Sequence, residues 1–224
     1  MLDDDPTVDD RENRMSHADD RSPRLLRATR TLEESPALDP VVERLHPWVV
    51  RALDRQPGLA RLLHGRPLGH ALHPLMTDTP IGLWTSAAVL DLTGGPSAGP
   101  HADRLLGLGI LAALPTSLTG LADWAVSGRR TRRVGVAHAA LNSAGLVLYA
   151  GSWVLRRRGA RPLGVAASLA ATGLVSASGY LGGHMSSRLG APPRGHSGPP
   201  TTRPTPDADE VDATADQVGP SSAL

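Results

Sequence analysis

The sequence contains no cysteine, no phenylalanine and no lysine, and only 3% of its 224 residues are aromatic. The absence of cysteine excludes a disulfide scaffold, a zinc ribbon, a thiol enzyme and an iron–sulfur ligand set within this polypeptide. Because lysine is absent, all 23 basic residues are arginine, and 22 acidic residues reduce the net charge to +1. A chain with this balance has no overall basic field, so we expect no nucleic-acid partner.

Apolar periodicity is missing from both ends of the chain. Residues 1–36 hold ten acidic and six basic side chains, and no apolar pattern is present to offset the entropy of ordering them. Asp3, Asp4 and Asp5 stand where a secretory signal has a basic region, so we expect no signal peptide. Residues 191–224 are rich in Pro, Thr, Asp and Ala. We therefore predict a disordered acidic arm over 1–36 and a disordered tail over 191–224.

Residues 37–66 show the spacing of an amphipathic helix. Asp39 and Pro40 form a good helix start, and Pro47 predicts a kink. The apolar residues at helical spacing are Val41, Leu45, Trp48, Val49 and Leu53, and the charged residues opposite them are Glu43, Arg44, Arg51 and Asp54. Such a helix fits two placements equally well, on a membrane surface or packed against its own domain.

Four apolar segments follow, each about long enough to cross a bilayer. They cover 74–93, 105–125, 134–155 and 162–183, with GGPSAGPHADR, VSGRRTRR and RRRGAR as separators. The third and fourth contain no Asp, Glu or Arg, which is typical of membrane spans rather than of soluble helical bundles. The sequence therefore predicts an all-α integral membrane protein. We expect an antiparallel four-helix bundle over 67–190, preceded by the amphipathic, interfacial helical segment 37–66 and flanked by disordered tails.

Arginine counts predict the orientation of these spans. On the side shared by both termini lie ten arginines between Arg51 and Arg194, against five on the opposite side between Arg104 and Arg161. Positively charged residues accumulate on the cytoplasmic side of membrane proteins. We therefore expect a multi-pass protein of the inner (plasma) membrane with both termini in the cytoplasm.

Most titratable residues of the spans lie near one membrane face in this arrangement. The set comprises His70, His73, Asp78, Asp123, His138 and His184, whereas the opposite face offers only Asp91, His101, Asp103 and loop arginines. Helical spacing aligns His138 with Asn142, Gly145 and Tyr149, and small residues of this kind mark an inward face. Ionisable residues at membrane depth are costly unless paired or hydrated. We predict that the six side chains converge at the cytoplasmic end.

Four ordered motifs in the chain resemble the bacterial membrane family called domain of unknown function 2231. They are GHALHPLMTDTPIGLWTSAAVLDLTGG, AALPTSLTGLADW, RRVGVAHAALN and SGYLGGHMSSRLG, and the resemblance covers residues 67–190. It implies four membrane spans and a domain often joined to a Rieske iron–sulfur domain. Since this chain has no cysteine, we expect any iron–sulfur partner to be a separate protein.

Three functions fit these residues. The first is a structural or partner-binding membrane protein whose polar cluster ties the helix ends together. The second is a redox module in which His138, with His184 or His73, clamps haem b, although few aromatic residues are present to pack a porphyrin. The third is a divalent metal site built from the six residues of the set, with Asp78 or Asp123 as a base.

No catalytic motif accompanies these residues. GxSxG, HExxH and a phosphate-binding loop are all missing, so we expect no enzymatic activity from the chain by itself. The expected partners are the lipid bilayer, with a second copy of the chain and a separate Rieske-type or other redox protein as further candidates. We favour the structural or partner-binding function, with the haem or metal module as the alternative.

Overall fold

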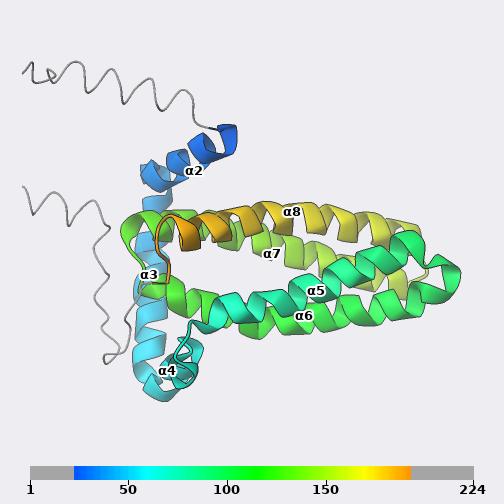
Figure 1. The fold of residues 1–224 in the computed structure, drawn as a ribbon, viewed down its shortest axis with the longest axis horizontal. Coiled ribbons are helices and arrows are strands. Elements are labelled where there is room, and N and C mark those ends of the chain that lie inside the picture. The colour runs from blue at the N-terminus through cyan, green and yellow to red at the C-terminus, as the bar shows by residue number, and fades with distance from the viewer. Residues whose placement is uncertain (1–22, 193–224) are drawn as a thin grey trace, which may run out of the picture.

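A computed structural model describes residues 23–192, and all regular secondary structure in this range is helical. Figure 1 shows the long helices lying lengthwise beside one another, with shorter helices at one end. The elements are α2 (Arg24–Glu34), η1 (Pro36–Leu38), α3 (Asp39–Arg55), α4 (Pro57–Leu63), η2 (Arg66–Leu68), α5 (Leu72–Thr93), α6 (Gly95–Ala125), α7 (Arg129–Arg157) and α8 (Arg161–Ser187).

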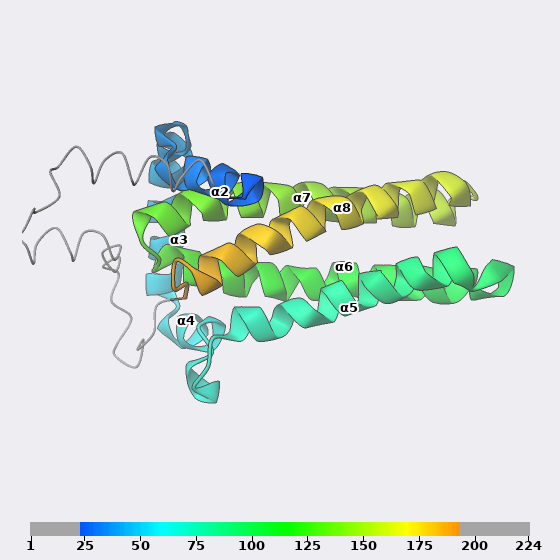
Figure 2. The ribbon, with the colours of Figure 1, turned by 45° about the horizontal axis from the view of Figure 1, so that its top comes forward.

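The long helices associate as two pairs. Helix α5 packs along α6 and α7 packs along α8, and the contacts between the two pairs are sparser than those within each pair. Figure 2 separates the pairs clearly. We call the end where α5 meets α6 and α7 meets α8 the turn end, and the end next to α3 the platform end.

The first separator is largely helical, which corrects the sequence prediction. Helix α6 begins at Gly95 rather than near residue 105, so most of GGPSAGPHADR belongs to its first turns. Gly95 adopts a φ of 67°, a conformation that favours glycine and permits the abrupt reversal after Thr93. Pro96 lies in the first turn, where a missing N–H costs little. Pro100 and Pro115 lie inside the same helix, which continues to Ala125.

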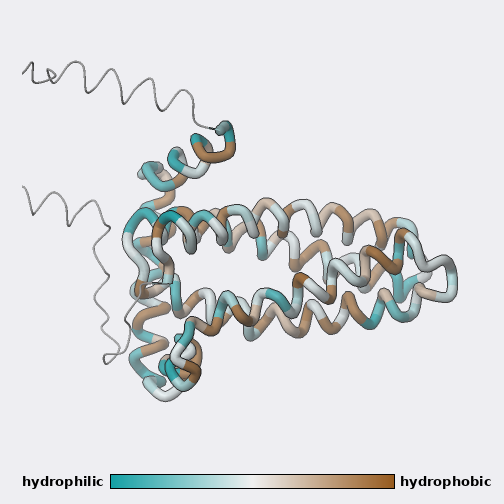
Figure 3. Tube along the Cα trace, in the orientation of Figure 1, coloured by the Kyte–Doolittle hydropathy of each residue, from teal (hydrophilic) through white to brown (hydrophobic). Residues whose placement is uncertain are grey.

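Three helices are long and apolar enough to cross a membrane: α6, α7 and α8. Each of them exposes large apolar side chains. On α6 the exposed ones are Leu108, Leu111, Leu114, Leu118 and Leu121, and Figure 3 shows apolar colour recurring along the length of the long helices. Exposing apolar side chains to water costs free energy, whereas apolar side chains that face lipid carry no such cost. This surface therefore fits a bilayer.

The centre of the long helices is filled by a few large side chains among small ones. Trp84 of α5 stacks on Tyr149 of α7 with ring centroids 4.1 Å apart, and Leu106 is fully buried beside them. Gly109 allows the indole of Trp84 to approach, because a Cβ there would overlap the ring. Small residues bring helix backbones close, which is the usual basis of helix packing in membranes.

The prediction of disorder over 1–36 is wrong for its last part. Residues 24–34 form α2, which packs against α7 and buries Thr29 and Glu33. The apolar pattern gave no sign of this helix because its contact is largely polar. Residues 1–22 and 193–224, which make up most of the two predicted disordered segments, lie outside the described residues.

Helix α3 lies across the platform end, roughly perpendicular to the long helices (Figure 1). It starts at Asp39, continues through Pro47 and ends before Gln56, where α4 follows. Val42 is buried and α3 contacts α6 and α7, so one face packs against its own chain. A second apolar face stays exposed: Val41, Leu45 and Trp48 are 41%, 48% and 66% exposed.

Candidate functional site

His73 lies at the start of α5 and is held by the adjacent helix. Its Nδ1 is 2.9 Å from the carbonyl oxygen of Thr116 and 3.2 Å from Oγ1 of Thr119. A Cβ on Gly120 would come within 2.7 Å of the imidazole, so the glycine makes room for the ring. Because a carbonyl only accepts, this contact requires the proton on Nδ1. The neutral ring then has its lone pair on Nε2.

His138 of α7 has the same relation to α8. Its Nδ1 donates to the carbonyl oxygen of Ser178 at 2.9 Å, and the Ser178 hydroxyl lies 2.8 Å from the same nitrogen. A Cβ on Gly182 would lie 3.2 Å from this ring. Nδ2 of Asn142 is 3.0 Å from Nε2 of His138 and can donate to it. Both histidines are therefore anchored through Nδ1 to a backbone carbonyl.

His184, near the end of α8, pairs with Glu33 of α2 rather than with another histidine. Nε2 of His184 lies 2.7 Å from Oε1 of Glu33, and both residues are 7% exposed. Arg133 of α7 donates to the backbone carbonyl of Glu33 at 2.9 Å. This buried contact fixes α2 against the ends of α7 and α8.

Asp39 ties the start of α3 to the start of α7. Arg133 donates to both carboxylate oxygens at 2.7 Å, and Arg129 adds a bond of 3.1 Å. The bidentate geometry is the strong form of this interaction. The hydrogen bond from Arg133 lowers the pKa of Asp39 below its ordinary value, against the opposing effect of desolvation.

Asp123 of α6 faces His64, which follows α4. Oδ1 of Asp123 lies 3.3 Å from Nδ1 of His64, and the two side chains are 11% and 6% exposed. Within residues 23–192, Oδ2 of Asp123 is buried and has no hydrogen-bond partner. The sequence does not single out His64, because a histidine in a short polar segment shows no pattern that distinguishes it.

The six predicted residues are thus divided among different contacts. His70 and Asp78 are exposed, whereas His73, Asp123, His138 and His184 each meet the separate partners described above. Among the residues the structure describes, no group of three or more His, Cys, Asp or Glu side chains could hold a metal ion.

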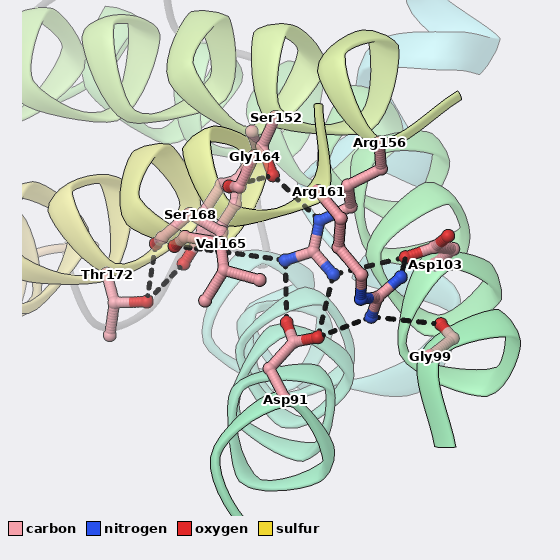
Figure 4. A network of polar contacts seen from close by, with 11 residues as sticks. Asp91, Gly99, Asp103, Ser152, Arg156, Arg161, Gly164, Val165, Ser168 and Thr172 are labelled. Atoms are coloured by element: carbon pink, nitrogen blue, oxygen red, sulfur yellow. Dashed lines mark hydrogen bonds and ion pairs between the residues drawn. The ribbon is translucent and has the colours of Figure 1, made fainter. Parts of the chain in front are cut away.

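A larger polar network occupies the turn end, where the sequence offers only Asp91, His101, Asp103 and loop arginines. Arg156 of α7 donates from Nη1 and Nη2 to the two oxygens of Asp91 on α5, at 2.9 and 2.6 Å. Arg161 of α8 donates to Asp91 at 2.7 Å, and both arginines reach Asp103 of α6 at 3.1 and 2.9 Å. All four long helices contribute one charged residue to this network (Figure 4).

The centre of the network is buried, and the donors of Arg156 are satisfied. The side chains of Arg156 and Asp91 are 0% and 1% exposed. Nε of Arg156 donates to Ser152 at 3.1 Å and Nη2 donates to Ser168 at 2.9 Å. Two carboxylates face two guanidinium groups, so the charges balance where an isolated ion would be very costly. The assignment of Arg156 to the separator RRRGAR is therefore wrong, because it belongs to the last turn of α7.

Comparison with known proteins identifies the family. The family model described as "Predicted membrane protein (DUF2231)" matches residues 69–192. The chain belongs to this family. The match spans α5 to α8, so both polar ends of the long helices lie within the family domain, while α2 to α4 precede it. Neither the curated proteins nor the solved structures contain a match to the chain.

Proposed function

We propose that this DUF2231 protein is a four-span scaffold of the inner membrane, an antiparallel four-helix bundle that carries a helical platform on its cytoplasmic face. The platform consists of residues 24–68, which include α2, α3 and α4. Both termini then lie in the cytoplasm, in accord with the arginine distribution.

Helix α5 is the fourth span in this proposal, although it is not among the helices that are apolar enough by composition alone. Its polar character comes partly from Asp91, which is paired with Arg156 and Arg161 at the turn end, and from Asp78, which is exposed. Pairing offsets much of the cost of placing a carboxylate near the membrane. A helix from Leu72 to Thr93 is about the length that a bilayer requires.

The attachment of the platform carries the functional proposal. Three polar contacts connect it to three different long helices: Glu33 with His184 of α8, Asp39 with Arg133 of α7, and His64 with Asp123 of α6. The predicted cluster residues His184 and Asp123 are used in this attachment. This supports the structural interpretation of the polar residues over a metal site.

The platform also presents a surface for binding. Val41, Leu45 and Trp48 form an exposed apolar stripe on α3, and the guanidinium of Arg51 lies 4.7 Å from the centre of the Trp48 ring. On α4, Leu59 and Leu62 are 50% and 54% exposed. Apolar and aromatic residues beside arginines are typical of helices at the headgroup level of a membrane. We propose that this stripe contacts lipid headgroups.

Trypsin accessibility tests the attachment. In membrane vesicles with the cytoplasmic face outward, arginines of the platform should be cleaved slowly in the unmodified protein. The double substitution Glu33→Ala with Asp39→Ala should release α2 and α3 and speed their cleavage at least several-fold, while the membrane-embedded fragment stays intact.

Glu34→Ala is the matched control, because Glu34 adjoins Glu33 on the same helix but is exposed. Equal cleavage of the double variant and the Glu34→Ala control would contradict the proposed attachment.

A second function, a haem-containing redox module, is favoured by one observation. His73 and His138 have the same backbone anchoring on two different helix pairs, whereas His184 is occupied by Glu33. Since the chain has no cysteine, any iron–sulfur centre would belong to a separate protein.

A further inference from the structure

The two helix pairs repeat the same pattern of residues. His73, Trp84 and Asp91 on α5 have the same spacing as His138, Tyr149 and Arg156 on α7. On the second helix of each pair, Pro100, Thr116 and Gly120 have the same spacing as Pro162, Ser178 and Gly182. In each pair a histidine of the first helix bonds the carbonyl of the Thr or Ser, and the glycine one turn later faces that histidine's ring.

Burial repeats in the same register. The buried residues of α5 are Pro80, Trp84 and Ala87, and their counterparts Gly145, Tyr149 and Ser152 are all buried on α7. The six buried residues of α8 are Gly164, Ser168, Ala171, Ser178, Leu181 and His184, and each corresponds to a buried residue of α6: Ala102, Leu106, Gly109, Thr116, Thr119 and Ala122. The α5–α6 and α7–α8 pairs are therefore two copies of one hairpin, related by an approximate twofold axis.

Equivalent residues of the two copies meet each other. Trp84 stacks on Tyr149, and Asp91 forms an ion pair with Arg156, so the inner faces of α5 and α7 approach one another near the axis. His73 and His138 continue these two faces toward the platform end, since residues spaced by 11 lie on one side of a helix.

We propose that His73 and His138 are the two axial ligands of a single haem b held between the two hairpins. Both rings donate Nδ1–H to a backbone carbonyl, which fixes the tautomer that leaves Nε2 as the coordinating atom. Helices that face each other across a bundle are the usual source of such ligand pairs. Nε2 of His73 has no hydrogen-bond partner among the described residues, and Nε2 of His138 meets only Asn142.

The composition of the site favours haem over a free metal ion. A divalent ion in a protein site normally takes three or more protein ligands, and no such group exists within the described range. Haem iron requires only two axial ligands, because the porphyrin supplies the other four. The contacts between the two hairpins are sparser than those within each hairpin.

Haem titration of the detergent-purified full-length chain tests this proposal. Ferric haem b should bind at one equivalent and give the low-spin absorption and electron paramagnetic resonance signals of bis-imidazole iron. His73→Ala and His138→Ala should each convert this signal to a high-spin one and weaken binding at least tenfold, with similar effects because the positions are equivalent.

His70→Ala and His101→Ala are matched controls, since both histidines are exposed. These two substitutions should leave the spectrum unchanged. His138→Met provides a variant that can still coordinate iron, and it should bind haem with the altered spectrum of mixed His/Met ligation. No binding by the unmodified chain, or a bis-imidazole spectrum that survives His73→Ala or His138→Ala, would overturn the proposal. Because neither outcome depends on the platform, the trypsin result stays independent of this one.

Discussion

Asp91 and Arg156 show how a charged residue can be retained inside this membrane domain. Their side chains are almost completely buried, and a bond of 2.6 Å connects them. Serine hydroxyls and the second Asp–Arg pair satisfy the remaining donors and acceptors. The energetic benefit of such a pair relative to apolar residues is small, but the loss of one partner leaves a buried charge uncompensated.

We therefore predict that Asp91→Asn or Arg156→Gln alone lowers the free energy of unfolding by about 3 kcal/mol or more. The double variant should lose less than the sum of the two, with a coupling of about 1 kcal/mol or more, because no net charge remains. Unfolding in mixed detergent micelles gives the four values of this cycle. Asp78→Asn, an exposed carboxylate on the same helix, should change the free energy by about 0.5 kcal/mol at most. Strict additivity of the two single effects would contradict the pairing.

At the scale of single elements, α3 has two apolar faces with different partners. Val42 is buried against the long helices, and His46 places Nε2 2.9 Å from the carbonyl of Ala125. The stripe that includes Trp48 lies beside this packed face and remains exposed. The two placements that the sequence left open, on its own domain and on a membrane surface, are thus compatible within one helix.

The lipid contact of α3 predicts a distinct fluorescence result. In liposomes, lipids brominated near the headgroup should quench the fluorescence of Trp48. The contribution of Trp48 is the difference in fluorescence between the unmodified protein and Trp48→Tyr. The corresponding difference for Trp84→Tyr should show little quenching by the same lipids, because Trp84 is 7% exposed and stacked on Tyr149. If aqueous iodide quenches Trp48 and the brominated lipid does not, the stripe faces water or a soluble partner instead.

At the scale of the whole molecule, long apolar runs predicted the α-helical class and four membrane spans, because hydropathy acts over a continuous segment. Three of the four long helices have the length and hydropathy of a span. The polar contacts were harder to predict, since each joins residues distant in sequence. Glu33 gave no sign that it would reach His184, and Arg156 resembled a loop charge. The proline-rich start of α6 resembles a separator in the sequence, because proline is typical both of loops and of the first turn of a helix. The repeated spacing of His73 and His138 was present in the sequence and could have revealed the two hairpins.

The central claim, a four-span bundle with its platform in the cytoplasm, depends on whether α5 crosses the membrane. Because the chain has no cysteine, single cysteines can be placed at exposed positions on either side: Gln56→Cys and Ser186→Cys at the platform end, Ser97→Cys and Arg158→Cys at the turn end. A membrane-impermeant maleimide should label positions 97 and 158 in spheroplasts, and positions 56 and 186 only after the membrane is permeabilised. Labelling of positions 56 and 97 from the same side would contradict the account, because α5 would then not be a span.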